Sequence, residues 1–426
     1  MISQQSILDY KKELILFSGL FVMIIAIMLF MGSAYGLRML VEASCYAIIA
    51  FGLTIQWGYA GLFNAGIMGF MALGAFMTML FSFPVNEDFW SSGLPSELGA
   101  VLLKLILGIG LIWASTKLTK VGVAQKWQRL ITVLLIAIVY IGYMSALGPV
   151  AESIEKEVGF IGGFGLPGWM GWLVGGVVAG LIAYFVGHIC LGLRSDYLAI
   201  ATLGISEIIK AFLKNADWLT NGTLTVSPLP WPTPGPADLG FELARASYLS
   251  ITALVIAVIF FLLTRAYNAP WGRMLRAIRD NEVSSLAMGK DVNKRRLEVF
   301  IFGSFLMGLG GAILATFNGL FDPNGYIPLN HTFLIWVMVI LGGAGNNLGT
   351  LFGAVFVYII WTMSEPAALF VFDIIRHIGE AAGWTLPADL DSRALQARVL
   401  VIGLTISLVL RYAPKGLIPE RLTQHQ

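Results

Sequence analysis

Long apolar segments alternate with short polar segments along most of the chain. The first apolar segment, Leu14–Met31, follows Lys11 and Lys12 and is longer than the core of a signal peptide, so we interpret it as a retained membrane span. A helix needs about 20 apolar residues to cross a bilayer. By this criterion we expect further spans at about 39–57, 61–83, 98–115, 130–147, 168–190, 197–213, 248–264, 298–317, 333–345, 347–364 and 395–410.

The charges in the loops test this assignment. Segments 116–129 and 265–297 and the tail from Arg411 are rich in Lys and Arg, whereas the charged residues of segments 84–97 and 148–167 are mostly acidic. Basic and non-basic loops therefore alternate as the positive-inside rule requires, which predicts that both termini are cytoplasmic.

Two of the expected spans are short. Segments 197–213 and 333–345 are compatible with half-helices or re-entrant segments as well as with full spans. We therefore predict an all-α integral membrane protein with ten to twelve transmembrane helices.

Composition supports this fold class. The 426 residues are 57% hydrophobic and only 12% charged, with a mean hydropathy of +0.80, whereas soluble globular domains are about 25% charged. Cys45 and Cys190 both lie inside apolar segments, so neither a disulfide framework nor a metal site is indicated.

The sequence lacks the motifs of several other protein classes. No G-x-x-x-x-G-K-[ST] sequence occurs, so we do not expect the chain to bind ATP through a Walker A loop. The four histidines lack H-E-x-x-H spacing and no G-x-S-x-G sequence is present. We expect no catalytic residues, no metal site and no bound cofactor. The basic segment is short and flanked by spans, which does not favour nucleic-acid binding.

The segment 265–297 is the main polar interruption of the chain. It holds eight Lys or Arg residues against three acids, and Met274, Leu275, Ile278 and Leu286 recur at roughly helical spacing before Gly289. This pattern predicts one short amphipathic helix outside the bilayer, with Gly289 at its C-cap. Such a helix can dock into a partner's groove. A topogenic loop that binds only lipid headgroups explains the same residues equally well.

The sequence GRMLRAIRDNE at 272–282, followed by AMGKDV at 287–292, resembles the cytoplasmic loop of branched-chain amino acid ABC transporter permeases of the LivM/LivH family, and is LivM-like. Similar stretches occur at 193–209 (LRSDYLAIATLGISEII), 339–353 (VILGGAGNNLGTLFG) and 411–417 (RYAPKGL). The resemblance spans most of the chain from about residue 38 to 418. Typical members connect residue 83 to the span near 168 only briefly, so 98–147 is expected to be an inserted hairpin.

The resemblance implies a permease subunit rather than an enzyme. It implies residues 1–37 as an N-terminal span and lead-in, 38–418 as the permease domain and 419–426 as a cytoplasmic tail. It also implies a bacterial inner-membrane location in contact with lipid, a second homologous permease, two cytoplasmic ABC ATPases that bind ATP and Mg²⁺, and a periplasmic substrate-binding protein. The residues that it implies for ATPase coupling are Gly272, Arg273, Arg276, Ala277, Arg279, Asp280, Asn281, Glu282 and Gly289.

Two glycine-rich segments are candidates for the translocation pathway. They are 58–74 (GYAGLFNAGIMGFMALG) and 342–353, and glycine-interrupted apolar segments in both halves of a transporter favour a midplane site. Close helix packing through small residues explains the individual glycines as well. The candidates are Asn64, Gly66, Gly343, Asn346 and Asn347.

Glu207 is a further pathway candidate because ionisable residues inside a membrane are costly. Lys210 lies three residues later, so a structural ion pair on one helix is the alternative. The proline-rich stretch 227–236 (SPLPWPTPGP) predicts an extended spacer outside the membrane, or part of a docking surface.

Other functions remain open at this level. Within the family the substrate can instead be another amino acid, urea or a short amide. An ion-coupled secondary transporter that uses Glu207, or a structural membrane scaffold, are alternatives outside the family.

Overall fold

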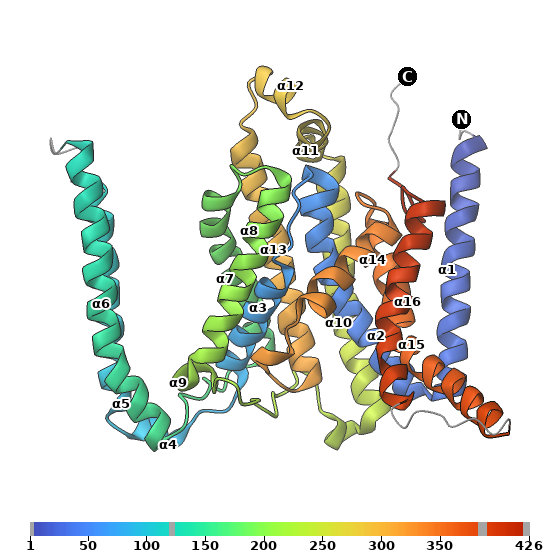
Figure 1. The fold of residues 1–426 in the computed structure, drawn as a ribbon, viewed down its shortest axis with the longest axis horizontal. Helices are drawn as coiled ribbons and strands as arrows, with labels where there is room; N and C mark the ends of the chain where they lie inside the picture. Colours follow the sequence, from blue (N-terminus) through green and yellow to red (C-terminus); the bar gives the residue numbers. More distant parts are fainter. Residues whose placement is uncertain (1–3, 119–123, 382–389, 421–426) are drawn as a thin grey trace.

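A computed structural model describes residues 4–118, 124–381 and 390–420, and these form an assembly of helices with two isolated β-bridges (Figure 1). The helices are α1 (Gln4–Met31), α2 (Ser33–Leu53), η1 (Thr54–Tyr59), α3 (Ile67–Ser82), α4 (Glu87–Ser91), α5 (Leu94–Ser115), α6 (Gln125–Glu157), α7 (Gly168–Cys190), α8 (Ser195–Asn215), α9 (Asp217–Thr220), α10 (Pro236–Asn268), α11 (Pro270–Asp280), α12 (Glu282–Ala287), α13 (Val292–Asn318), η3 (Pro323–Gly325), η4 (Leu329–Phe333), α14 (Leu334–Gly342), α15 (Asn347–Ala381) and α16 (Leu390–Tyr412).

The predicted class, an all-α integral membrane protein, is confirmed. In the described part of the chain, eight helices are long and apolar enough to cross a membrane, and two shorter apolar helices cover 67–82 and 329–342. Helices α8 and α16 occupy the two other positions where spans are expected. The expected span at 61–83 needs a correction, because its helix begins only at Ile67 and residues 61–66 are not helical.

The helices run between two ends of the molecule. Helices α11 and α12, the start of α1 and the end of α16 lie at one end, which we call the α12 end (Figure 1). Helices α4 and α9 and the start of α10 lie at the other, which we call the α9 end. The start of α6 and helix α11, which belong to the two basic segments, thus lie at the same end, in agreement with the loop charges.

The centre of the bundle consists of α2, α3, α7 and α13; α2, α3 and α13 bury most of their residues, and α7 buries about half. Close backbone approach of small residues holds it together: a Cβ on Gly74 of α3 would lie 1.9 Å from the carbonyl oxygen of Gly308 in α13. In a membrane, where burial of apolar surface from lipid contributes little, such van der Waals contact is a main source of helix association.

Helices α5 and α6 form an antiparallel pair that stands apart from the central bundle (Figure 1). Their own small apolar cluster joins them to α4 near the α9 end through Phe89, Leu94, Leu98, Val101, Val150 and Ile154. Most of their other apolar side chains are exposed, as lipid-facing side chains would be. That this pair is an insertion relative to the family remains a prediction.

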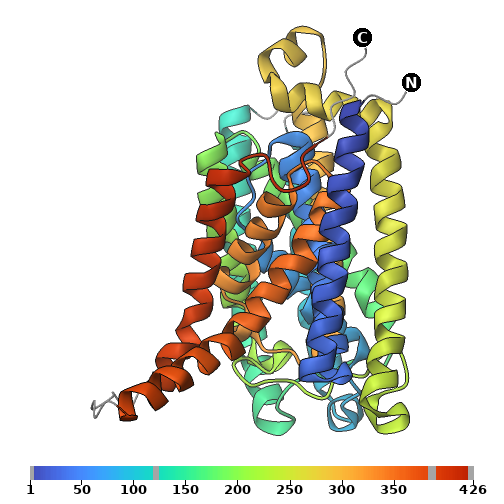
Figure 2. The same ribbon diagram turned by 90° about the vertical axis from the view of Figure 1, so that its right-hand side faces the viewer.

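The opposite edge of the molecule carries α1, α15 and α16. Figure 2 shows the second half of α15 leaving the bundle at the α9 end, and α16 returning along the edge toward the α12 end. Pro366 lies inside α15, where its ring removes one helical hydrogen bond.

Candidate functional site

The two glycine-rich segments are interrupted helices that lie against each other. In the first, α2 ends in the π-helical turn η1, and residues 61–66 leave helical geometry before α3. In the second, the π-helical turn η4 leads into α14, and Gly343 and Gly345 adopt φ of +117° and +86° before α15. Both interruptions expose backbone groups that need partners.

Side chains from other helices satisfy the first interruption. The Ala65 N–H donates to Thr202 Oγ1 at 3.0 Å, and the Met68 N–H donates to Thr332 Oγ1 at 3.2 Å. Asn64 Oδ1 accepts from the Gly66 N–H at 2.7 Å. Non-helical backbone at membrane depth requires such internal partners. These hydrogen bonds therefore stabilise the interruption within the fold.

Direct contacts join the two interruptions. Trp336 Nε1 of α14 donates to the Asn64 carbonyl oxygen at 3.0 Å, and the Tyr59 hydroxyl donates to Asn347 Oδ1 at 2.6 Å. The ring of Phe63 stacks on that of Trp336 with centroids 4.1 Å apart. Segments about 280 residues apart in sequence therefore form one unit.

Asn64 is fully buried inside this unit. Its Nδ2 donates to Gln56 Oε1 at 2.8 Å, and Gln56 Nε2 donates to the Phe300 carbonyl oxygen at 2.9 Å and to Ser304 Oγ at 3.2 Å. The amide thus links the first interruption to α13. Gly66 is also buried and takes part in the same turn.

Glu207 is exposed on α8, although Thr202 of the same helix packs against Gly66 of the first interruption. Both Glu207 and Lys210 are described, and no ion pair joins them. Among the described residues, no hydrogen bond or ion pair joins Glu207 to the other pathway candidates.

The predicted single amphipathic helix at 272–289 is wrong in one respect, because it is two helices. Asn281 has extended backbone geometry, ends α11 and caps α12 by accepting a hydrogen bond from the Ser284 N–H at 3.0 Å. An Asx residue is a strong helix N-cap, which explains the break. Gly289 follows α12 with φ +73°, which glycine adopts without steric cost.

Arg279 of α11 points into the protein. Its Nη1 donates to the Gly58 carbonyl oxygen in the first interruption, and its Nη2 lies 3.0 Å from Glu420 Oε2 in the C-terminal segment. Gly345 of the second interruption packs beside both Arg279 and Glu420. One guanidinium therefore joins α11 to both interruptions.

Arg276 also faces inward. Its guanidinium lies 4.1 Å from the centroid of the Tyr267 ring, and its Nη1 donates to the Tyr267 carbonyl oxygen at 3.2 Å. The Tyr267 hydroxyl in turn donates to Glu420. Gly272 is buried, and a Cβ at this position would lie only 2.2 Å from the Tyr267 carbonyl oxygen.

The C-terminal segment after α16 completes this arrangement. The N–H groups of Leu417 and Ile418 donate to the carbonyl oxygens of Leu341 and Gly342 at 2.8 and 3.0 Å, and Asn346 Nδ2 donates to the Pro419 carbonyl oxygen at 3.0 Å. We call Arg279, Glu420, Tyr267 and the backbone of Gly58 and Gly345 the junction. No sequence pattern indicated Glu420 as a partner.

The other predicted coupling residues lie on or near the outer side of α11 and α12. Four of them are exposed: Arg273, Ala277, Asp280 and Asn281. Glu282 is half-buried and forms a bidentate ion pair with Arg296, with N–O distances of 2.8 and 2.9 Å. This pair fixes α12 on the start of α13.

An exposed apolar face on α12 and the residue after it was not predicted. Val283, Leu286 and Met288 are 76%, 52% and 79% exposed. Helical spacing revealed an amphipathic segment but not which apolar residues the protein covers. Leu275 and Ile278 of α11 pack inward, whereas these three do not.

Comparison with known proteins assigns the chain to a family. Residues 35–409 match the model of the branched-chain amino acid transport system permease component. The chain belongs to this family. This permease is 26% identical over 252 residues to a probable branched-chain amino acid transport permease protein LivM of Methanocaldococcus jannaschii. The matched region covers 58% of the chain and 67% of the relative.

Two further relatives are similar to parts of this permease. The high-affinity branched-chain amino acid transport system permease protein LivM of Escherichia coli is 26% identical over 216 residues, which are 45% of the chain and only 50% of that protein. The ribose import permease protein RbsC of Haemophilus influenzae is 29% identical over 122 residues, 28% of the chain and 37% of that protein. No solved structure matches the chain significantly.

Proposed function

We propose that this chain is the transmembrane permease subunit of an ATP-driven ABC importer for branched-chain or related amino acids. It forms half of a translocation pathway with a second, homologous permease in the bacterial inner membrane. Two ATPase subunits bind ATP and Mg²⁺ and dock on the α12 end, and a periplasmic binding protein delivers substrate to the α9 end. Membership in the permease family and the names of the LivM relatives support this proposal.

The observation that carries the proposal is the exposed surface of α11 and α12. These helices project beyond the bundle at the α12 end (Figure 1), where Val283, Leu286 and Met288 expose apolar surface next to the charged residues Arg273 and Asp280. An apolar helix face rimmed by charge outside the membrane helices fits a protein groove. We call these five residues the docking face.

Charge distribution supports the orientation. Segment 265–297 is rich in Lys and Arg, and the positive-inside rule places such a loop in the cytoplasm. The described ends of α1 and α16 lie at the same end of the molecule, which supports cytoplasmic termini (Figure 1).

The junction supplies a route for coupling. A displacement of α11 by an ATPase would act on Gly58, in the first interruption, and on Glu420, which packs against the second, because Arg279 binds both. Interrupted helices commonly form the substrate sites of transporters. In this proposal the docking face receives the motion and the junction transmits it to the pathway.

Copurification with the candidate ATPases tests the docking face. We expect the double variant Val283→Asp, Met288→Asp to lose the ATPase, because two carboxylates would be desolvated in the interface. Arg279→Gln should keep the ATPase but reduce substrate uptake per ATP hydrolysed. Leu224→Asp changes a similarly exposed apolar residue at the other end and is the matched control.

The outcomes separate the two roles. Retention of the ATPase by the Asp double variant at normal membrane expression would refute the docking face. Loss of the ATPase by Leu224→Asp would show that the assay reports misfolding. Unchanged uptake per ATP in Arg279→Gln would remove the junction from the coupling route.

A further inference from the structure

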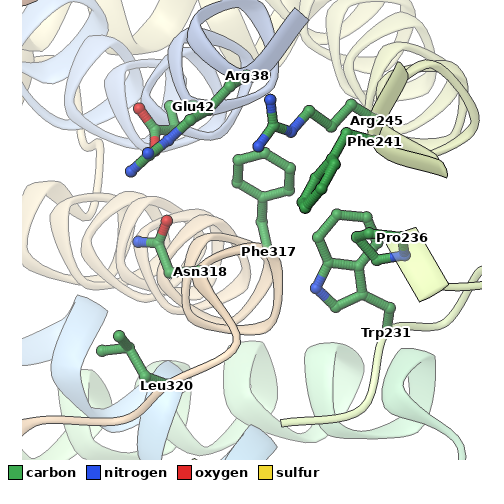
Figure 3. A pocket seen from close by; sticks show the side chains of 9 residues that line it. All are labelled: Arg38, Glu42, Trp231, Pro236, Phe241, Arg245, Phe317, Asn318 and Leu320. Atoms are coloured by element: carbon green, nitrogen blue, oxygen red, sulfur yellow. The ribbon is translucent and has the colours of Figure 1, made fainter. Parts of the chain in front are cut away.

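A pocket of about 450 Å³ opens at the α9 end, opposite the docking face (Figure 3). It lies between the first turns of α2, the start of α10 and the end of α13. Nine residues line it: Arg38, Glu42, Trp231, Pro236, Phe241, Arg245, Phe317, Asn318 and Leu320. Its volume falls in the range of small-molecule sites, about 300–1,000 Å³.

The pocket holds one positive charge in excess. Arg38 Nε lies 3.1 Å from Glu42 Oε1, so these two charges compensate each other, and the Tyr358 hydroxyl donates to the other oxygen of Glu42. Arg245 donates to the Ala34 carbonyl oxygen at 2.7 Å, and no carboxylate of the described chain forms an ion pair with it.

The neighbouring acid does not neutralise Arg245. Glu242, three residues earlier on α10, accepts a hydrogen bond from the Ser33 hydroxyl instead. Two guanidinium groups and one carboxylate therefore face a single cavity. Placing Arg245 beside Arg38 without a counter-ion is unfavourable, and an anion in the cavity would relieve the repulsion.

Aromatic rings form the other wall. Trp231 stacks on Phe317 with ring centroids 5.4 Å apart, and the Arg245 guanidinium lies 5.3 Å from the Phe241 ring centroid. In Figure 3 these rings gather beside Arg245, away from Arg38 and Glu42. One side of the cavity therefore carries Arg38 and Glu42, the other side carries the aromatic rings, and Arg245 lies beside the rings.

We propose that this pocket binds an amino acid with an apolar side chain as it enters the permease. Its carboxylate lies between Arg245 and Arg38, because guanidinium groups bind carboxylates in a bidentate manner. Its side chain packs against Trp231 and Phe317, and its ammonium group faces Glu42. The identity of the ligand rests on the proposed importer function.

This arrangement discriminates among solutes. Urea, short amides and a neutral sugar carry no carboxylate, so they would leave the excess charge of Arg245 uncompensated. An amino acid with a zwitterionic head and an apolar side chain matches both walls of the cavity. The site thus favours amino acids over the neutral substrates that the family resemblance left open.

Cysteine labelling tests the site in the full chain. Leu320 lines the pocket and is exposed, so Leu320→Cys places a thiol in the pocket without removing a proposed ligand contact. Cys45 and Cys190 are buried, which keeps background labelling low. Leu224→Cys is the control, because Leu224 is exposed outside the pocket. The probes are small anionic and cationic methanethiosulfonates, applied to the protein in zwitterionic lipid nanodiscs.

The excess positive charge should favour the anionic reagent at Leu320→Cys. Replacing Arg245 by Gln removes one positive charge from the pocket and should lower the anionic-to-cationic rate ratio severalfold. Leucine should slow labelling at Leu320→Cys, whereas leucinamide and urea should not. Labelling at Leu224→Cys should not respond to leucine. Loss of protection by leucine in Arg245→Gln is also expected.

Several results would overturn the inference. Equal protection by leucinamide would show that no carboxylate is recognised, and absence of protection at tens of millimolar leucine would show that the pocket is not a site for it. Protection that appears only in anionic lipid, without leucine, would assign the pocket to a headgroup phosphate. The rate ratio in Leu320→Cys needs no Arg245 variant, so a folding defect cannot obscure it.

Uptake by the assembled importer separates this inference from the proposed function. Leucine uptake without protection at Leu320→Cys refutes the pocket alone. Protection by leucine without ATP-driven uptake supports the pocket and refutes the importer.

Discussion

Arg279 makes the contacts that are most informative to break. Its ion pair with Glu420 has an N–O distance of 3.0 Å, and the two side chains are only 22% and 15% exposed. The same guanidinium donates to the Gly58 carbonyl oxygen. Arg279→Gln should therefore remove a charged hydrogen bond, about 1.5–3 kcal/mol, and leave Glu420 without its cation.

The expected loss of stability follows from burial. Breaking one partner of a fully buried ion pair costs about 3–5 kcal/mol, whereas an exposed pair contributes about 0–1 kcal/mol. Since both side chains keep some contact with solvent, we expect Arg279→Gln to lower the free energy of unfolding by roughly 2–3 kcal/mol.

A double-mutant cycle with Glu420→Gln isolates the pair. The purified protein is unfolded in mixed micelles by titration with a denaturing detergent, for the wild type, both single variants and the double variant. Contacting residues usually show coupling of about 0.5–3 kcal/mol, and we expect about 1–2 kcal/mol here. Additivity within about 0.5 kcal/mol would refute the junction as described.

The chain provides a matched control for this cycle. Lys156 Nζ lies 2.6 Å from Glu152 Oε1, but both side chains are mostly exposed on α6. Lys156→Gln and Glu152→Gln should show much weaker coupling, because water solvates both charges whether or not they pair. Comparable coupling in the two cycles would mean that the distance between charges, and not burial, decides the effect.

Two further predictions concern the core. Gly74→Ala should destabilise the protein by at least about 1–3 kcal/mol, because its Cβ would overlap the backbone of α13. The control Gly204→Ala, on an open face of α8, should be neutral or stabilising. Thermal unfolding measures both variants, and equal unfolding temperatures would contradict the packing argument. Asn64→Ala should leave Gln56 without its amide partner, at a cost of about 1–3 kcal/mol. The control Asn215→Ala, on the exposed surface, should have little effect. An unchanged unfolding midpoint for Asn64→Ala would show that the hydrogen-bond network relaxes when the Asn64 amide is removed.

The sequence predicted the helices well where hydrophobic length alone decides them. It also located the polar segment around α11, because a cluster of Lys and Arg between apolar segments has few explanations in a membrane protein. It failed at the break between α11 and α12. An Asn such as Asn281 favours a helix N-cap and disfavours a helix interior. The apolar spacing across 274–286 nevertheless fits one continuous helix, so it does not reveal the break.

Long-range partners could not be predicted from spacing. Gly58 lies 221 residues from Arg279 in the sequence, and Glu420 lies in a segment whose sequence predicts only a polar tail. Which arginine turns inward depends on how α11 packs on the end of α10, and this packing is a property of the folded chain. Arg273 and Arg279 have equal propensity and opposite placement.

The stretch 227–236 gives a similar lesson. Its prolines favour an extended chain, and the structure shows a chain that is held on the bundle at Leu229 and Trp231. Leu229 is buried and its N–H donates to the Gly319 carbonyl oxygen at 2.8 Å, and Trp231 stacks on Phe317. A single aromatic residue within the proline run was the available signal.

The arrangement of rigid and interrupted elements restricts how the permease can move. Helices α3, α7 and α13 meet through glycine backbones in direct contact, so they cannot slide without steric overlap and should move as one body. Gln56 ties the first interruption to α13, and Arg279 ties it to α11. A displacement of α11 must therefore either break the contact with Gly58 or bend the chain between Gln56 and Gly66. Bending requires little energy where helical hydrogen bonds are already interrupted. We therefore expect the non-helical segment 61–66 to change conformation during transport.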